Sequence, residues 1–234
     1  MKSHNRQIEA YKTDRPLKFH ERDTLSIVAK HFPHDNCHIL DIGCASGSLI
    51  TELAGTYQYA TIHGLERDPE LISIARKRLE RTSAIIHEAD AFHFSPPTTF
   101  DLIIASGIIT VFDDQLKALD QWLSWLSDGG TIILFTHFTE KEIDFIIHHR
   151  SHNNDKGWET GLSVFSTHTY SNHLNTLGLD HYFKDFRLPV LIEESSDPIR
   201  SYSVEQKHGP SMIVYGGVVI SDQKFLVITK NTAT

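Results

Sequence analysis

Short apolar runs alternate with stretches of helical spacing from residue 38 to residue 136. The runs occupy residues 38–43, 61–66, 84–89, 100–106 and 131–136, and amphipathic stretches such as 68–79 and 113–126 lie between them. Strands that are apolar along nearly their whole length and that alternate with helices are typical of a parallel sheet covered on both faces. The alternation therefore predicts an α/β fold with a doubly wound, mostly parallel sheet and right-handed crossovers.

The last third of the chain has a different pattern. Residues 170–177 have helical spacing, and strands are predicted at 181–188, 201–206, 212–220 and 225–230. Gly209-Pro210 and Ser221-Asp222 are predicted turns between these strands. We expect a mainly antiparallel end to the sheet, with an extra C-terminal β-hairpin before the last strand. No repeat or linker separates two domains, so a single domain is expected over residues 1–234.

The charge and composition argue against several classes of protein. The chain has 22 Lys and Arg against 30 Asp and Glu, a formal net charge of −8. Nucleic-acid affinity depends largely on clustered cations that displace counterions, so nucleic acid is a disfavoured partner. The N-terminal residues contain no apolar signal core, and the longest apolar stretches are too short to span a bilayer. Cys37 and Cys44 are expected to be reduced thiols, which favours a cytoplasmic protein.

Residues 40–49, LDIGCASGSL, combine the end of a strand, a turn of small residues and the start of a helix. The free N–H groups at a helix start favour anionic or polar ligand groups. Open parallel sheets bind ligands outside the carboxyl ends of their strands, where this turn is expected to lie. The spacing of Gly43, Ala45 and Gly47 differs from the G-x-G-x-x-G dinucleotide pattern, which disfavours an NAD-dependent oxidoreductase.

Five segments in this order resemble motifs of the class I S-adenosylmethionine-dependent methyltransferases. They are 39–47, Glu66 at the end of the second strand, Asp90 with Ala91 and Phe92, 100–106, and 126–133. The resemblance implies a Rossmann-like fold whose seven-stranded, mostly parallel sheet ends in an antiparallel C-terminal strand. It also implies a helical lid in residues 1–36, a cofactor-binding core in 37–138 and an acceptor side in 139–234.

The resemblance implies S-adenosyl-L-methionine as the cofactor and a role for each matching residue. Asp41 would lie near the amino group of the cofactor, and Glu66 would accept hydrogen bonds from both ribose hydroxyls. The small residues of the turn would let the amino-acid end of the cofactor lie against the backbone; they are Gly43, Cys44, Ala45 and Gly47.

The remaining matches would hold the adenine and border the methyl group. Asp90 would accept a hydrogen bond from the adenine amino group, and the N–H of Ala91 would contact a ring nitrogen. Arg67 and Phe92 would flank the adenine faces, and Ser106, together with Gly107, would border the methyl donor. Candidates for the lid are Tyr11, Arg15, Phe19 and His20.

Each acid also has a simpler interpretation. Asp41 could cap the turn that follows it, and Glu66 and Asp90 could be solvated acids at strand ends. A helical pair, His148 and His152, could bind a metal ion, but no acid or cysteine accompanies it at a suitable spacing. We therefore expect no metal and a solvated helix end there, and likewise a solvated face for the basic run 76–81.

A methyl group on a sulfonium is already activated, so the protein mainly has to align the reactants. His137 directly follows the fifth strand and is the candidate general base or substrate contact. The Pro-Pro-Tyr and Pro-Cys signatures of base-modifying relatives are absent, which favours transfer to an oxygen or nitrogen of a small molecule. Alternatives are a catalytically silent cofactor-binding module and an RNA or protein methyltransferase, and the C-terminal hairpin could form a homodimer surface.

Overall fold

The computed structural model describes residues 16–32, 36–150, 157–160, 162–194, 199–205, 211–216 and 219–232. Tyr11, Arg15 and His152 lie outside these ranges. The helices are α2 (Phe19–His31), α3 (Ser48–Thr56), α4 (Pro69–Arg78), α5 (Gln115–Ser124) and α6 (Thr167–Thr176), with a short 3₁₀ turn at Ile109–Val111. The strands are β1 (His38–Ile42), β2 (Thr61–Glu66), β3 (Ile85–Glu88), β4 (Phe100–Ser106), β5 (Leu126–Thr139), β6 (Phe165–Ser166), β7 (Asp180–Asp185), β8 (Tyr202–Val204), β9 (Met212–Tyr215) and β10 (Val219–Thr229).

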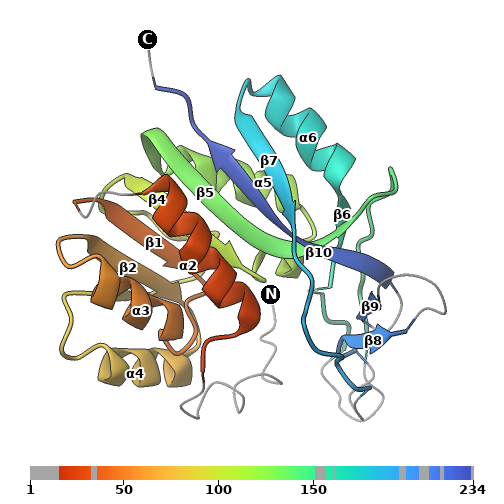
Figure 1. Cartoon of the computed structure of the whole chain (residues 1–234), viewed down its shortest axis with the longest axis horizontal. Helices are drawn as coiled ribbons and strands as arrows, with labels where there is room; N and C mark the ends of the chain where they lie inside the picture. The colour runs from red at the N-terminus through yellow and green to blue at the C-terminus, as the bar shows by residue number, and fades with distance from the viewer. Residues whose placement is uncertain are drawn as a thin grey trace.

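The described strands form one sheet in the order β3-β2-β1-β4-β5-β10-β9-β8, with β7 also paired to β10 and β6 to β5 (Figure 1). Neighbouring strands from β3 to β5 are parallel, whereas β10 is antiparallel to both β5 and β7. The strands from β3 through β10 to β7 form a mostly parallel sheet with an antiparallel C-terminal strand. This part of the fold prediction is confirmed. The carboxyl ends of β1, β2, β3 and β4 therefore meet at one edge.

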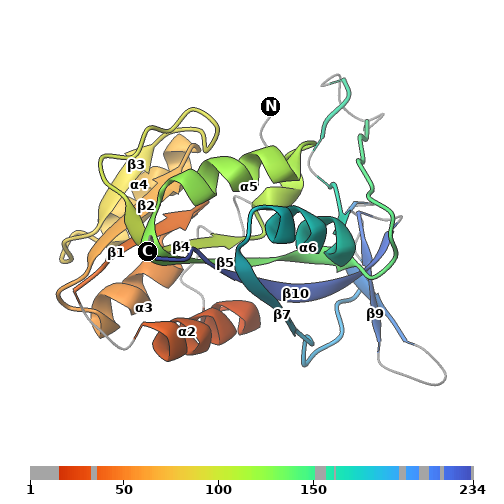
Figure 2. The ribbon, with the colours of Figure 1, turned by 90° about the horizontal axis from the view of Figure 1, so that it is seen from above.

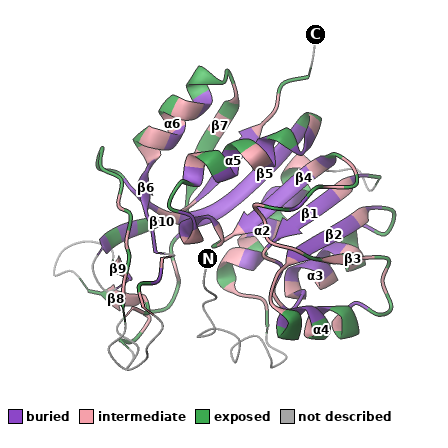
Figure 3. Cartoon of the chain, turned by 180° about the vertical axis from the view of Figure 1, so that it is seen from behind, coloured by how far each residue is buried: buried purple, intermediate pink, exposed green. Residues whose placement is uncertain are grey.

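Helices cover both faces of the sheet, with α2 and α3 on one side and α5 and α6 on the other (Figure 2). Trp122 of α5 and Tyr170 of α6 are fully buried in one core, and Val28 of α2 and Ile50 of α3 are fully buried in the other. The central strands are buried from both sides (Figure 3), which explains why their sequences are apolar without alternation. No helix in the described ranges is long and apolar enough to cross a membrane.

The start of α4 shows how local sequence sets an element boundary. The Asp68 carboxylate accepts hydrogen bonds from the N–H groups of Glu70 and Leu71, and Pro69 occupies the first helical position. The carboxylate satisfies donors that have no partner within the helix, and the missing N–H of proline costs nothing there. An acid directly before a proline is a typical helix start, so the local sequence accounts for this boundary.

Two predictions for the C-terminal third are wrong. Residues 212–220 are not one strand, because β9 ends at Tyr215, Gly216 has a φ of +60°, and β10 begins only at Val219. Ser221-Asp222 is not a turn; both residues lie inside β10, where Ser221 pairs with β9 and Asp222 with β5. β10 thus joins the main sheet to the inserted β8–β9 hairpin.

The predicted helix end around His148 is also wrong. Phe145 and His149 form isolated antiparallel bridges with Val164 and Glu159. Backbone pairing with a distant segment replaces the helical hydrogen bonds there, and spacing within 143–152 alone does not reveal that partner.

Candidate functional site

The turn between β1 and α3 lies at the edge where the parallel strands end. Gly43, Ala45 and Gly47 have φ angles of +74°, +48° and +77°, so three residues adopt left-handed backbone conformations. Glycine adopts them without penalty, whereas alanine pays about 1–2 kcal/mol. The Ala45 N–H donates to Glu66 Oε2 at 3.1 Å, which holds the strained residue in place.

Glu66 is the last residue of β2, and its carboxylate accepts hydrogen bonds from three backbone N–H groups of the neighbouring loops. Its Oε1 accepts hydrogen bonds from Arg67 N at 2.8 Å and Asp68 N at 3.0 Å, in addition to the bond that Oε2 receives from Ala45. Each carboxylate oxygen can accept more than one hydrogen bond, so the side chain can support the turn and still receive a donor from a ligand.

Asp90 follows β3 beside Glu66. Its Oδ1 accepts a hydrogen bond from Phe92 N at 2.9 Å, and Arg67 Nη1 lies 3.5 Å from its Oδ2. Arg67 therefore contacts both acids at the sheet edge, Glu66 through its backbone N–H and Asp90 through its guanidinium.

A hollow that is partly open to solvent lies between these acids and the segment after β4. It combines apolar walls with two carboxylates; its lining is Gly43, Leu65, Glu66, Arg67, Ala89, Asp90, Ala91, Ile108, Val111 and Phe112. Phe92 does not line it but packs edge-to-face on Phe112, with ring centroids 4.5 Å apart. We call this the first hollow.

A second hollow shares Gly43 with the first, so the two adjoin at the turn. Its lining is more polar; it consists of Lys18, His20, Glu21, Asp41, Gly43, Cys44, Ala45, Ser46, Ser48, Leu49 and Ser106. Of the residues from the start of α2, His20 was a predicted lid residue, whereas Lys18 and Glu21 were not predicted, because nothing in the local pattern places the first turn of α2 over β1.

Asp41 is the most unusual group in the second hollow. Its residue is 4% exposed, and within the described ranges its carboxyl group has no hydrogen-bond partner. Burial, followed by the nearby carboxylates of Glu21 and Glu66, raises the pKa of Asp41 to about 7. The hydroxyl of Ser106, at the end of β4, is also buried without a partner in the part of the chain that the structure describes. Buried polar groups are normally paired, so both point to a missing ligand.

Arg78 supports the turn from outside, and the predicted solvated face of 76–81 is wrong at this residue. Its Nη1 donates to the carbonyl and hydroxyl oxygens of Ser46 at 2.8 and 2.9 Å and to Ser48 Oγ at 2.7 Å. Gly47, the N-cap of α3, faces Ala75 and Leu79 near the end of α4. The end of α4 thus holds the turn by contacts that its basic run did not reveal.

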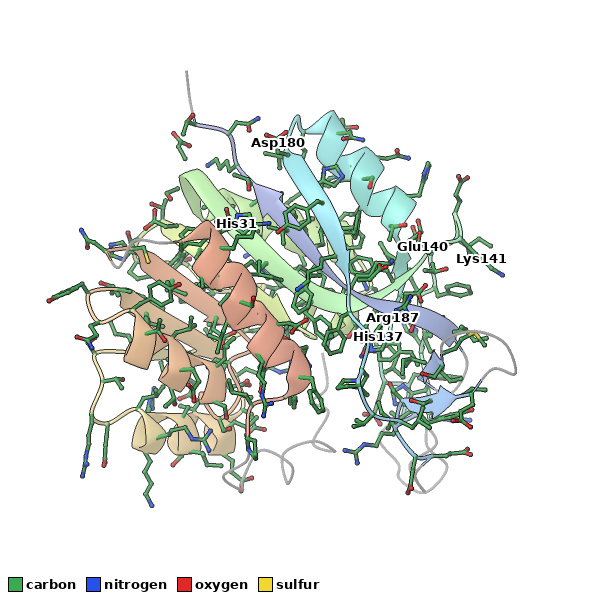
Figure 4. The ribbon with its side chains drawn as sticks, viewed as in Figure 1. His31, His137, Glu140, Lys141, Asp180 and Arg187 are labelled. Atoms are coloured by element: carbon green, nitrogen blue, oxygen red, sulfur yellow. The ribbon has the colours of Figure 1, made fainter. Side chains whose placement is uncertain are left out.

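His137 lines neither hollow. It lies where β5 runs beside β10 (Figure 4), with Nδ1 2.8 Å from Ser221 Oγ and Nε2 3.2 Å from Gln223 Nε2. Its ring stacks on Tyr215 at a centroid distance of 3.9 Å, and burial, followed by His20, lowers the pKa of His137 to about 3. Both ring nitrogens are engaged, so action as a base would require one hydrogen bond to be exchanged.

Within the described ranges, no group of three or more His, Cys, Asp or Glu side chains is placed to hold a metal ion. His148 Nε2 instead lies 3.0 Å from Asp113 Oδ2 on the surface. The polar groups at the sheet edge include carboxylates, backbone amides and hydroxyls.

Comparison with known proteins agrees with this geometry. The solved structure of CalS10, an amino pentose methyltransferase from Micromonospora echinaspora, has a TM-score of 0.60 at 15% identity and covers 99% of this chain and 98% of its own. The N-methyltransferase NodS from Bradyrhizobium japonicum has a TM-score of 0.56 at 16% identity, with coverage of 98% and 99%. These similarities show the fold.

Two sequence relatives match less than half of the chain. A trans-aconitate 2-methyltransferase from Rhodopseudomonas palustris is 30% identical over 94 residues, and one from Rhizobium etli is 29% identical over 93 residues. Each match spans 40% of this chain and 36% of the relative. A family described as "Methyltransferase domain" matches residues 33–186, well over half of the chain. This protein therefore belongs to that family of methyltransferase domains.

Proposed function

We propose that this chain is an S-adenosylmethionine-dependent methyltransferase that acts on an oxygen or nitrogen of a small-molecule acceptor. The observation that carries the proposal is Asp41, a buried and unpaired carboxyl group beside the strained turn. An unpaired buried acid costs free energy unless a ligand supplies its partner. The ammonium group at the amino-acid end of S-adenosylmethionine would supply one.

The two adjoining hollows fit the two ends of that cofactor. In the first hollow, Glu66 would bind the ribose hydroxyls, and Asp90 would bind the adenine amino group beside Ala91. Leu65, Ile108 and Phe112 provide apolar walls for the base. In the second hollow, Asp41 would bind the ammonium group, with Ser106 beside the methyl group. When bound, the cofactor supplies an electrophilic methyl group on a sulfonium sulfur.

The chain's own contribution to transfer would be alignment and exclusion of water. The segment after Ser106 is fixed on the acceptor side, because Thr110 accepts hydrogen bonds from Tyr215 Oη at 3.0 Å and from Ser163 N at 3.1 Å. His137 stacks on that same Tyr215 and stays a predicted catalytic or acceptor contact. The sequence relatives are trans-aconitate 2-methyltransferases, but each match spans only 40% of this chain and 36% of the relative, so we propose only the small-molecule class for the acceptor.

Calorimetric titration with S-adenosylmethionine, S-adenosylhomocysteine and NAD tests the cofactor. We expect one equivalent of each sulfur nucleoside to bind and no heat from NAD; binding of NAD alone would contradict the proposal. Release of S-adenosylhomocysteine over a panel of small hydroxy, amino and carboxylic acids tests transfer. Binding with no product from small molecules, RNA or peptides would favour the silent binding module instead.

A further inference from the structure

One wall of the first hollow is formed by the segment that follows β4, residues 107–112. The side chains of Ile108, Val111 and Phe112 line the hollow. Ile108 also packs against the turn after β1, since a Cβ on Gly43 would lie 3.3 Å from Ile108 Cδ1. The position of this segment therefore sets the space between the wall and the acids on the other side of the hollow.

The segment has little regular structure of its own. It contains a 3₁₀ turn of three residues, Ile109–Val111, and such short turns have few hydrogen bonds and poor hydrogen-bond geometry. Ile109 is fully buried in the core and anchors one side of the turn. Gly107, where the segment begins, has a φ of +72°, and a Cβ there would meet no atom within 4 Å. Contacts from other elements are therefore needed to fix the rest of the segment.

Thr110 connects this segment to the inserted hairpin. Tyr215, at the end of β9, donates from its Oη to Thr110 Oγ1 at 3.0 Å, and the Thr110 hydroxyl donates to the carbonyl of Gly107 at 3.4 Å. The carbonyl of Thr110 accepts a hydrogen bond from Ser163 N at 3.1 Å. Thr110 is 3% exposed, so water has little access to these bonds. The wall of the first hollow is thus held by β9 and by the segment before β6.

The ring of Tyr215 is itself held in one orientation. It stacks on His137, with ring centroids 3.9 Å apart and an interplanar angle of 19°. Beside it, a Cβ on Gly216 would lie 3.1 Å from Leu162 Cδ1, so the hairpin packs closely on the segment before β6. Burial raises the pKa of Tyr215, so its hydroxyl keeps its proton and acts as a donor. Fixed packing therefore directs this hydroxyl at Thr110.

We infer that Tyr215 is a positioning residue for cofactor binding, which acts through Thr110 to hold residues 107–112 against the nucleoside. The inference rests on the proposed function. Tyr215 lines neither hollow, so it acts on the cofactor site through Thr110 and not by contact. A wall that is free to move must be ordered when the ligand binds, and the apparent affinity falls with the fraction of protein in the competent form. The inserted β8–β9 hairpin thus completes the cofactor site from outside.

The variant Tyr215→Phe keeps the ring that stacks on His137 and removes the hydroxyl. We expect about three- to tenfold weaker binding of S-adenosylhomocysteine, the effect of losing one hydrogen bond that orders the wall. The probe 5′-methylthioadenosine carries the same adenosine, so its affinity should fall by the same factor. Calorimetric titrations are made below the melting temperature of each variant, where a residue that only stabilises the fold would leave both affinities unchanged.

Variants of Thr110 test whether the two hydroxyls act as one link. Thr110→Val has a similar volume and lacks the hydroxyl, so it should weaken both compounds, whereas Thr110→Ser keeps the hydroxyl and should bind as the wild type does. Tyr215→Phe combined with Thr110→Val should bind no more weakly than Thr110→Val alone, because the link can be lost only once. Tyr182→Phe is the matched control, because its hydroxyl lies 2.9 Å from His31 Nε2, between α2 and β7, and its affinities should not change.

The outcomes separate the two proposals. If Tyr215→Phe binds both compounds as tightly as the wild type does, the inference is overturned while the proposed function stands. Weaker binding of S-adenosylhomocysteine alone, or fully additive losses in the double variant, would overturn it equally. If neither compound binds the wild type, the proposed function fails and the inference fails with it.

Discussion

The substitution Asp41→Asn should make the unliganded protein more stable, and the gain should grow with pH. Asp41 is 4% exposed, and the pKa of its carboxyl is raised from 3.8 to about 7 in the folded state, mainly by burial. The folded state therefore binds the proton more tightly than the unfolded chain does. The resulting destabilisation is absent below pH 3.8, grows as the pH rises to 7, and is constant above that pH.

The magnitude follows from the size of the shift. A difference of about three pKa units corresponds to about 4 kcal/mol of destabilisation at pH 8. At pH 5 the cost is about 2 kcal/mol, because this pH lies only about one unit above the pKa of 3.8 in the unfolded chain and the folded carboxyl is still protonated. Asparagine removes this cost, but it leaves a buried amide without a partner. That second cost does not change with pH, so the difference of about 2–3 kcal/mol between the gains at pH 5 and pH 8 is the quantity to test.

Urea unfolding of both proteins at pH 5 and pH 8 measures that difference. Asp101→Asn on β4 is the control, because Asp101 accepts hydrogen bonds from His38 N at 2.8 Å and Ser127 Oγ at 2.7 Å. This control should lose stability at both pH values. A gain for Asp41→Asn that is the same at pH 5 and pH 8 would refute the reasoning.

Three further predictions follow from other sites. Glu66→Gln should weaken S-adenosylhomocysteine binding by about 1–3 kcal/mol, since a charged acceptor is lost; calorimetry would show unchanged affinity if the assignment were wrong. Gly64→Ala should destabilise the folded protein by about 1–3 kcal/mol, because the added Cβ would lie 2.6–2.7 Å from three side-chain atoms. Gly55→Ala has no atom within 4 Å of the added Cβ and should stabilise α3 by about 0.5–1 kcal/mol. Equal melting temperatures of the two variants would contradict this prediction. Burial lowers the pKa of His63 to about 4 and also lowers the pKa of its partner His87, so the folded protein loses stability as the pH falls below 6.5. The double variant with leucine at both positions should lose less free energy of unfolding between pH 7 and pH 5 than the wild type. An identical loss in both proteins would contradict this prediction.

The sequence predicted the features that depend on neighbours along the chain. The apolar strands β1, β2 and β4, the Asp68 cap and the turn at Gly43 each follow from a few adjacent residues. Because the strands are parallel, their order alone placed Glu66 and Asp90 at one edge, where both line the first hollow.

The features that could not be predicted from the sequence depend on residues that are distant along the chain. Arg78 reaches Ser46 and Ser48 from another helix, and Glu21 reaches the hollow of Asp41 only because α2 packs beside β1. A basic run and a capping glutamate have ordinary local explanations, so neither stands out before the packing is known. The break at Gly216 was hidden for a similar reason, since apolar residues flank it on both sides.

A crystal structure with S-adenosylhomocysteine tests the central claim most directly. We predict adenine and ribose in the first hollow, the Glu66 carboxylate within hydrogen-bonding distance of both ribose hydroxyls, and the ammonium group beside Asp41. A nucleoside bound elsewhere, or one whose amino-acid end points away from that buried acid, would contradict the account.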